Sequence, residues 1–203
     1  MMNKKAVWMA AAVAALVGGQ AMAQDTPWLV RLRTVQLSMA NERDAALEGV
    51  APGTAVNDKV IGELDVSYFF NKNWAAELIL TVPQRQLVKT NDGALGSFNH
   101  LPPTLSLQYH FTDLQGFKPY VGLGVNYTKI SSVSLDGGLT LDKSSTGASM
   151  QVGVDFPLDK KWSLNVDVKK VYIKTDVYGA DGVSVGTLKL DPTLFGVGIG
   201  YRF

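Results

Sequence analysis

The sequence predicts an all-β fold, an eight-stranded antiparallel up-and-down transmembrane β-barrel. First, apolar and polar residues alternate one by one along eight segments, the period of a strand whose side chains point to opposite faces. Second, short turns alternate with long polar connections, which is typical of an outer-membrane barrel. Third, the chain begins with an export signal.

The N-terminal segment has the layout of a secretory signal peptide. Lys4 and Lys5 precede an apolar run over residues 6–17, and Ala21-Met22-Ala23 forms an A-x-A cleavage site. The alternative, a spanning helix, would need about 20 apolar residues, more than this run provides. We therefore expect residues 1–23 to be a signal peptide that is cleaved near Ala23, and residues 24–203 to form the barrel.

The composition of the mature chain excludes several classes of partner. Removal of residues 1–23 removes two basic residues and no acidic one, which leaves 17 basic against 18 acidic residues. Such a balance gives no electrostatic reason to expect nucleic acid. The chain has no cysteine and 2 histidines, so we expect neither disulfides nor a metal or other cofactor.

Eight segments show the strand period, and their connections are of two kinds. The predicted strands cover residues 28–39, 60–70, 74–82, 104–111, 120–128, 148–156, 162–173 and 194–203. The connections at 71–73, 112–116 and 158–161 are short, whereas those at 40–59, 83–103, 129–146 and 174–192 are long and polar. An even number of strands places both ends of the mature chain on the side of the short turns.

The distribution of charge decides which face of the barrel points outward. A soluble lipocalin-like barrel would enclose its apolar face, whereas a membrane barrel exposes that face to lipid. A basic side chain facing lipid near the midplane costs about 2–4 kcal/mol, so the charged face belongs in the lumen. We expect the charges to neutralise one another there in a structural cluster of Arg31, Arg33, Glu63, Asp65, Glu77, Asp155, Asp167, Lys169 and Arg202.

Aromatic residues gather at the strand ends on the short-turn side. A belt of such residues marks a membrane–water interface. The predicted girdle consists of Trp28, Tyr68, Phe70, Trp74, Phe111, Phe117, Phe156, Trp162, Tyr201 and Phe203. Glycines on the opposite face, as in Gly196, Gly198 and Gly200, leave room for large side chains in a narrow lumen.

Several stretches resemble the OmpW family, small bacterial outer-membrane barrels that include the AlkL type. The most telling stretches are LPPTLSLQYHF at residues 101–111 and KPYVGLGVNY at 118–127, supported by WLVRLR at 28–33 and GIGYRF at 198–203. The resemblance implies a monomeric eight-stranded barrel in the bacterial outer membrane, with a narrow, partly hydrophobic lumen. It also implies uptake of small hydrophobic molecules with release sideways into the membrane, and in some members a role as colicin or phage receptor.

The strand directions divide the lumen into two tiers. Because the first strand rises from the periplasm, Arg31 and Arg33 lie low and the apolar inward residues lie high. We expect a hydrophobic vestibule in the outer half, lined by Val35, Leu37, Met39, Ile61, Ile79, Val171, Ile173 and Leu194. The alternative is that these residues simply pack beneath folded loops.

Prolines flank the second long connection. Because proline has no N–H for the ladder, Pro83, Pro102 and Pro103 predict a lateral opening in the wall. The alternative is that they only end strands.

The sequence thus favours a passive channel for small hydrophobic molecules. The alternative is a structural or receptor barrel whose long loops contact a colicin, a phage or a host. No nucleophile, base and orienting acid converge around His100 or His110, so no enzymatic activity is predicted.

Overall fold

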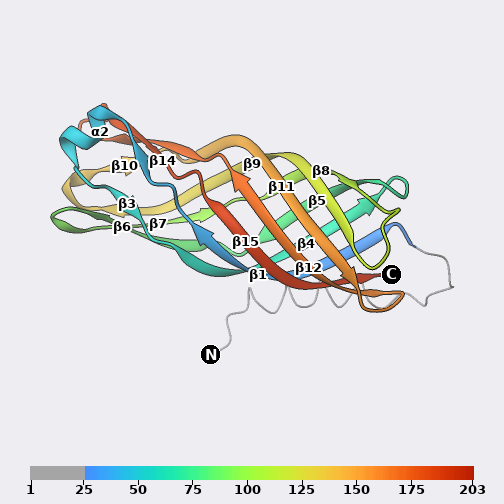
Figure 1. Cartoon of the computed structure of the whole chain (residues 1–203). Coiled ribbons are helices and arrows are strands. Elements are labelled where there is room, and N and C mark those ends of the chain that lie inside the picture. Colours follow the sequence, from blue (N-terminus) through green and yellow to red (C-terminus); the bar gives the residue numbers. More distant parts are fainter. Residues whose placement is uncertain (1–25) are drawn as a thin grey trace.

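The computed structural model describes residues 26–203, and these form a long antiparallel barrel (Figure 1). The predicted signal peptide and its cleavage site lie outside the described residues. In wall order the strands are β1 (Trp28–Ser38), β4 (Lys59–Phe69), β5 (Trp74–Thr81), β8 (Thr104–His110), β9 (Lys118–Leu135), β11 (Ser144–Pro157), β12 (Trp162–Val171) and β15 (Thr193–Arg202). β15 pairs with β1 from Leu29–Arg202 to Ser38–Thr193, which closes the cylinder. The predicted eight-stranded up-and-down barrel is confirmed.

One end of the barrel carries the short turns and the C-terminus. Asn71 Oδ1 accepts hydrogen bonds from the backbone N–H groups of Asn73 and Trp74. Asp159 Oδ1 accepts in the same way from Lys161 and Trp162, and these bonds lower the pKa of Asp159 because they stabilise its carboxylate. Both side chains close tight turns, so neighbouring wall strands are joined with little intervening chain.

The opposite end is built from the long polar connections, which contain regular structure of their own. The short elements are β2 (Glu42–Arg43), α2 (Ala45–Val50), β3 (Ala55–Val56), β6 (Gln84–Thr90), β7 (Gly93–Leu101), η1 (Asp136–Gly138), β10 (Thr140–Leu141), β13 (Lys174–Tyr178) and β14 (Ser184–Lys189). β7 pairs with the outer part of β9, and β6 and β3 follow it, while β10, β13, β14 and β2 form a second sheet. These two sheets extend the wall beyond the barrel proper (Figure 1).

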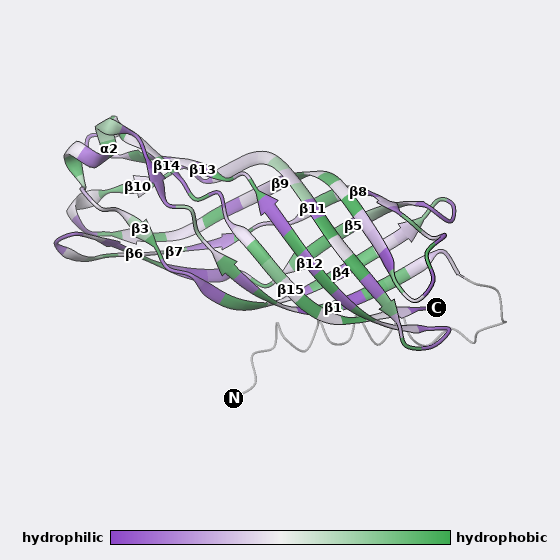
Figure 2. Cartoon of the chain, in the orientation of Figure 1, coloured by the Kyte–Doolittle hydropathy of each residue, from purple (hydrophilic) through white to green (hydrophobic). Residues whose placement is uncertain are grey.

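The outward face is apolar over the middle of the barrel (Figure 2). Leu123 is 70% exposed, and Leu105 and Val125 are each 60% exposed, the reverse of a water-soluble core. At the short-turn end, aromatic rings contact one another edge to face in two trios, Trp28–Tyr68–Phe70 and Trp74–Tyr109–Phe111, and in a third formed by Trp162, Tyr201 and Phe203. Among residues 26–203, no helix has the length and apolar character needed to span a bilayer.

A charge on this outward face should destabilise the barrel according to its depth. We expect Leu123→Arg to lower the free energy of unfolding by about 2–4 kcal/mol, because the guanidinium meets hydrocarbon. Ser131→Arg is the matched control: it lies on the same strand, β9, in the outer part, where we expect a change within about 0.5 kcal/mol. Urea unfolding in lipid vesicles measures both, and equal effects would contradict the assigned lipid face.

Candidate functional site

The lower lumen holds a compact network of charged side chains from five wall strands. Antiparallel register places Arg31 opposite Asp65 and Arg33 opposite Glu63 on neighbouring strands β1 and β4. Strand β5 adds Glu77, and the far wall contributes Asp155, Asp167 and Lys169. No side chain in this network is more than 8% exposed.

The two arginines make most of the ion pairs. Arg31 Nη1 lies 3.1 Å from Glu77 Oε1, and its Nη2 lies 2.7 Å from Asp155 Oδ2. Arg33 Nη2 contacts the same Glu77 oxygen at 3.1 Å, and its Nη1 lies 3.1 Å from Asp167 Oδ1. The guanidinium geometry suits this role because its several donors point in fixed directions.

A lysine completes the network at its outer edge. Lys169 Nζ lies 2.5 Å from Glu63 Oε1 and 2.9 Å from Asp167 Oδ1. Because Arg33 also contacts Asp167, the two acids and two bases form one continuous chain of charges over strands β12, β1 and β4. Arg31 joins this chain to the rest of the wall through Glu77 on β5 and Asp155 on β11.

The network contains three bases and five acids, and neutral donors bind three of the remaining carboxylate oxygens. Tyr120 Oη donates to Asp167 Oδ2 at 2.8 Å, Gln151 Nε2 to Glu77 Oε2 at 2.8 Å, and Asn165 Nδ2 to Asp155 Oδ1 at 2.9 Å. Such bonds matter because a buried charge is tolerated only when its remaining lone pairs are satisfied.

The predicted cluster member Arg202 contacts an aromatic ring of the lower lumen. Its guanidinium sits over the Phe69 ring, 4.2 Å from the ring centroid, near the short-turn end. Arg202 is the last residue of β15, so its side chain lies at the level of the short turns.

Space for the largest ring in the network comes from a glycine. Tyr120 is fully buried, and a Cβ at Gly153 would lie only 2.3 Å from its Cζ atom. A larger residue at 153 would push the Tyr120 hydroxyl away from Asp167. The inward glycine thus leaves room for a large side chain, as the sequence predicted for a narrow lumen.

The outer lumen is apolar but filled. Of the eight residues predicted to line a vestibule, Met39 is partly buried and the other seven are at most 8% exposed. Most of them pack in one cluster with apolar residues of the outer elements, such as Leu47, Phe98 and Leu190. In this structure the outer elements close over the apolar tier, so it forms a packed plug where the sequence had predicted a vestibule.

Helix α2 forms part of this covering. Asp44 caps the helix: its Oδ1 accepts from the backbone N–H of Leu47 at 2.8 Å, and its Oδ2 accepts from that of Thr187 at 2.9 Å. These backbone donors lower the pKa of Asp44 below its usual value. The cap ties α2 to β14 and holds Leu47, which is 1% exposed, in the apolar cluster.

The wall is interrupted where the prolines lie. β5 and β8 pair as far as Ile79–Thr104, β6 and β7 resume at Gln84–His100, and within the described residues no pair joins 80–83 to 101–103. We call this break, residues 80–83 and 101–103, the seam. On its β9 side the seam is fastened, because Asn126 Nδ2 donates to the carbonyls of Pro102 and Pro103 at 3.2 Å each.

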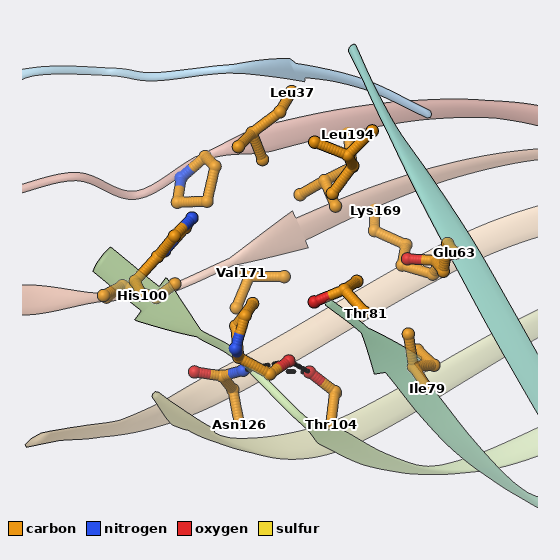
Figure 3. Close-up of a pocket in the computed structure, with 14 residues that line it drawn as sticks. Leu37, Glu63, Ile79, Thr81, His100, Thr104, Asn126, Lys169, Val171 and Leu194 are labelled. Atoms are coloured by element: carbon orange, nitrogen blue, oxygen red, sulfur yellow. Dashed lines mark hydrogen bonds and ion pairs between the residues drawn. The ribbon is translucent and has the colours of Figure 1, made fainter. Parts of the chain in front are cut away.

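A small cavity lies between the seam, the apolar tier and the top of the charge network (Figure 3). Its volume of about 20 Å³ is room for one water molecule. Leu37, Ile79, Val171 and Leu194 line it together with the Glu63–Lys169 pair. Members of all three predicted sets therefore meet around one space: six of the eight vestibule residues, Glu63 and Lys169 of the charge cluster, and Pro102 of the lateral opening. Among residues 26–203, no group of three or more histidine or acidic side chains has the arrangement of a metal site.

Sequence reasoning missed the neutral polar residues of the lumen. Tyr120, Gln151 and Asn165 bind the carboxylates, and Asn126 and His100 line the cavity. The alternation along each strand already predicts that these side chains face inward. It does not predict their partners, because the partners lie on strands that are distant in the chain.

The comparisons with known proteins agree with this architecture. The sequence model of the OmpW family matches residues 28–203. The chain belongs to the OmpW family. It is 43% identical to the uncharacterized outer-membrane protein y4mB of Sinorhizobium fredii over 188 residues, 88% of this chain and 80% of that protein. It is 31% identical to outer membrane protein W of Escherichia coli, over 98% of this chain and all of that protein.

A solved structure and a further relative in sequence are also similar to this chain. The crystal structure of the outer membrane protein OprG from Pseudomonas aeruginosa superposes with a TM-score of 0.72 at 26% identity, covering 87% of this chain and 95% of that one. The dibenzothiophene metabolism operon protein PahQ of Pseudomonas aeruginosa is 30% identical over 89% of this chain and 90% of that protein. This chain is thus an integral outer-membrane barrel.

Breaking the charge network should destabilise this OmpW-family barrel strongly. We expect Arg33→Met to lower the free energy of unfolding by about 3–5 kcal/mol, because Asp65, Glu77 and Asp167 lose their shared base in a buried site. Arg85→Met is the control: it removes an exposed side chain on β6 that hydrogen-bonds to Ser97. We expect this control to lower the free energy of unfolding by about 1 kcal/mol or less. Urea unfolding in vesicles compares them, and a small effect of Arg33→Met would show that the network is dispensable.

Proposed function

We propose that the protein is a passive outer-membrane channel for small hydrophobic molecules, which displace the packed side chains of the apolar outer lumen and leave sideways through the seam. The observation that supports this route most directly is the position of the charge network. It lies directly beneath the apolar tier and closes the cylinder toward the periplasm.

A straight path would be costly for an apolar solute. To pass the network, the solute would have to separate buried ions such as Glu63 and Lys169, whose charged atoms lie 2.5 Å apart. Leaving one such charge without its partner costs about 3–5 kcal/mol. The solute would gain nothing in return, because it can neither donate to the carboxylates nor accept from the bases.

The seam is the part of the wall that can separate with the least loss. Elsewhere neighbouring wall strands are joined by continuous ladders, but the ladder between β5 and β8 stops at Ile79–Thr104. Pro102 and Pro103 offer no N–H that would have to be left unpaired. Outside the seam lies the apolar lipid face, so an opening there would lead directly into hydrocarbon.

The family comparison supports a hydrophobic solute. A relative at 30% identity bears the name of a dibenzothiophene metabolism operon, and dibenzothiophene is an apolar aromatic compound. Members of the OmpW family are associated with uptake of molecules of this kind. A passive conduit needs no catalytic group, and we propose no enzymatic activity for the barrel.

A covalent bond across the seam should stop transport. The chain contains no cysteine, so Thr81→Cys with Pro102→Cys introduces only the intended pair. We expect the oxidised double variant to lose the protein-dependent uptake of an apolar solute by cells, and reduction to restore it. Mass analysis verifies that the disulfide has formed.

The control bridges two strands that are already paired. Thr34→Cys with Val197→Cys joins β1 to β15, where the two residues face each other in a continuous ladder. We expect uptake to stay unchanged when this bond forms. Normal uptake through the barrel with the sealed seam would rule out lateral release.

A charge in the apolar tier should also block uptake. Ile173 is 2% exposed and lines the cavity, so Ile173→Asp places a carboxylate on the solute path. Because the residue lies in the outer tier, away from the lipid face, we expect the variant to assemble but to take up the solute at the rate of cells without the protein. Ile173→Leu keeps the apolar volume and should retain uptake. Undiminished uptake by a folded Ile173→Asp barrel would count against this path.

The second candidate function is a receptor that transports nothing. It is favoured by a hollow of about 760 Å³ at the outer end, lined by β3, the β6–β7 hairpin and the chain that follows β1. The partner proposed for that surface is a colicin or a phage. Equal uptake of an apolar solute by cells with and without the protein, at equal membrane integrity, would favour the receptor.

A further inference from the structure

The outer lumen has two unlike sides. The side built by β1, β4, β12 and β15 is apolar, with Leu37, Ile61, Val171 and Leu194. The inward side of β5 to β9 is mainly polar at the same level: beside Ile79 it presents Thr81, Gln84, Gln86, His100, Thr104 and Asn126. A conduit for hydrocarbons alone would have no use for this polar side.

Among the described residues, three buried atoms on the polar side have no hydrogen-bond partner: Thr81 Oγ1, Gln86 Oε1 and His100 Nδ1. Two of them, Thr81 Oγ1 and His100 Nδ1, belong to residues that line the cavity, and the His100 residue is only 2% exposed. Both side chains line the cavity beside the seam (Figure 3). Buried polar groups are nearly always satisfied in native proteins, so two such atoms at one cavity indicate a ligand that bonds to them.

The neighbour of His100 limits what that ligand can be. Gln86 Nε2 lies 3.1 Å from His100 Nε2. With the amide in this orientation a neutral His100 bears its proton on Nδ1, and with the amide reversed Nδ1 is an acceptor. The Thr81 hydroxyl can both donate and accept. A hydroxyl group can bond to each of these atoms in either arrangement, whereas a carbonyl or ether oxygen can bond to His100 only when Nδ1 bears the proton.

The charges at the floor of the cavity indicate an uncharged ligand. Glu63 and Lys169 line the same space and are paired with each other. A carboxylate entering there would repel Glu63, and an ammonium would repel Lys169. The cavity volume of about 20 Å³ also fits a group of the size of one water molecule, such as a hydroxyl.

We propose that Thr81 and His100 form a binding site for the hydroxyl group of a small, uncharged amphiphile, an alcohol or a phenol. The hydroxyl occupies the cavity, and the apolar body lies along the seam toward the lipid. This assignment rests on the proposed transport function and names its substrate class. The barrel then prefers hydroxylated hydrophobic molecules over the corresponding hydrocarbons.

A matched pair of fluorescent probes tests this preference. 1-Naphthol and naphthalene differ by one hydroxyl, and uptake of each is measured in cells with and without the full-length protein. We expect the protein-dependent rate for 1-naphthol to exceed that for naphthalene. In Thr81→Val and in His100→Leu we expect the ratio of the two rates to fall about threefold to tenfold, the factor for one lost hydrogen bond. Thr34→Val, on the lipid face, should leave the ratio unchanged.

Stability measurements separate a lost site from a lost fold. Thr81→Val removes a buried hydroxyl that has no hydrogen-bond partner, so urea unfolding in vesicles should show a stability equal to or greater than that of the natural protein. His100→Leu also removes the hydrogen bond to Gln86, so we expect it to lower the free energy of unfolding by about 1–3 kcal/mol. An unchanged ratio in a folded Thr81→Val barrel overturns the site, and the unpartnered atoms then bind water only. If the protein speeds both probes equally, the hydroxyl preference fails while the transport function stands. If it speeds neither, the transport function itself fails.

Discussion

The buried charge network is the constraint on which the rest of the structure depends. Three basic and five acidic side chains can lie in a membrane barrel only if they face inward and contact one another. Arg31 and Arg33 on one strand meet carboxylates from four others, so five wall strands have a fixed register around this point. The apolar residues of the same strands must then face lipid, because side chains alternate along a strand.

The network also determines how the lumen is divided. Below it the cylinder ends in the aromatic belt, and above it the inward residues become apolar on one side and polar on the other. The outer elements cover this upper tier, with Leu47 of helix α2 in the apolar cluster. Closure at both ends leaves the interrupted ladder near Pro102 as the break in the wall beside the cavity.

The wall could be predicted from the sequence, but the outer elements and the polar partners could not. Strict alternation located the eight wall strands because one face of each is apolar. It fails in β6, where Gln84 and Gln86 are buried while Leu87 is 56% exposed, so the segment resembles a polar loop. The charged residues of the network were identified because alternation along the strands places them on the inward face. Alternation predicts which face a residue lies on but not its height, so the contact of the Arg202 guanidinium with the Phe69 ring could not be predicted.

Liposome swelling tests the closure of the lumen most directly. If the charge network closes the cylinder, vesicles containing the purified barrel should swell in an isotonic solution of a small sugar such as arabinose no faster than protein-free vesicles. The hydroxyl groups of a sugar find no hydrogen-bond partners in the hydrocarbon outside the seam, so a lateral route does not admit a sugar. Swelling that accelerates in proportion to the amount of barrel would show a water-filled passage through the network, and the division of the lumen described here would be wrong.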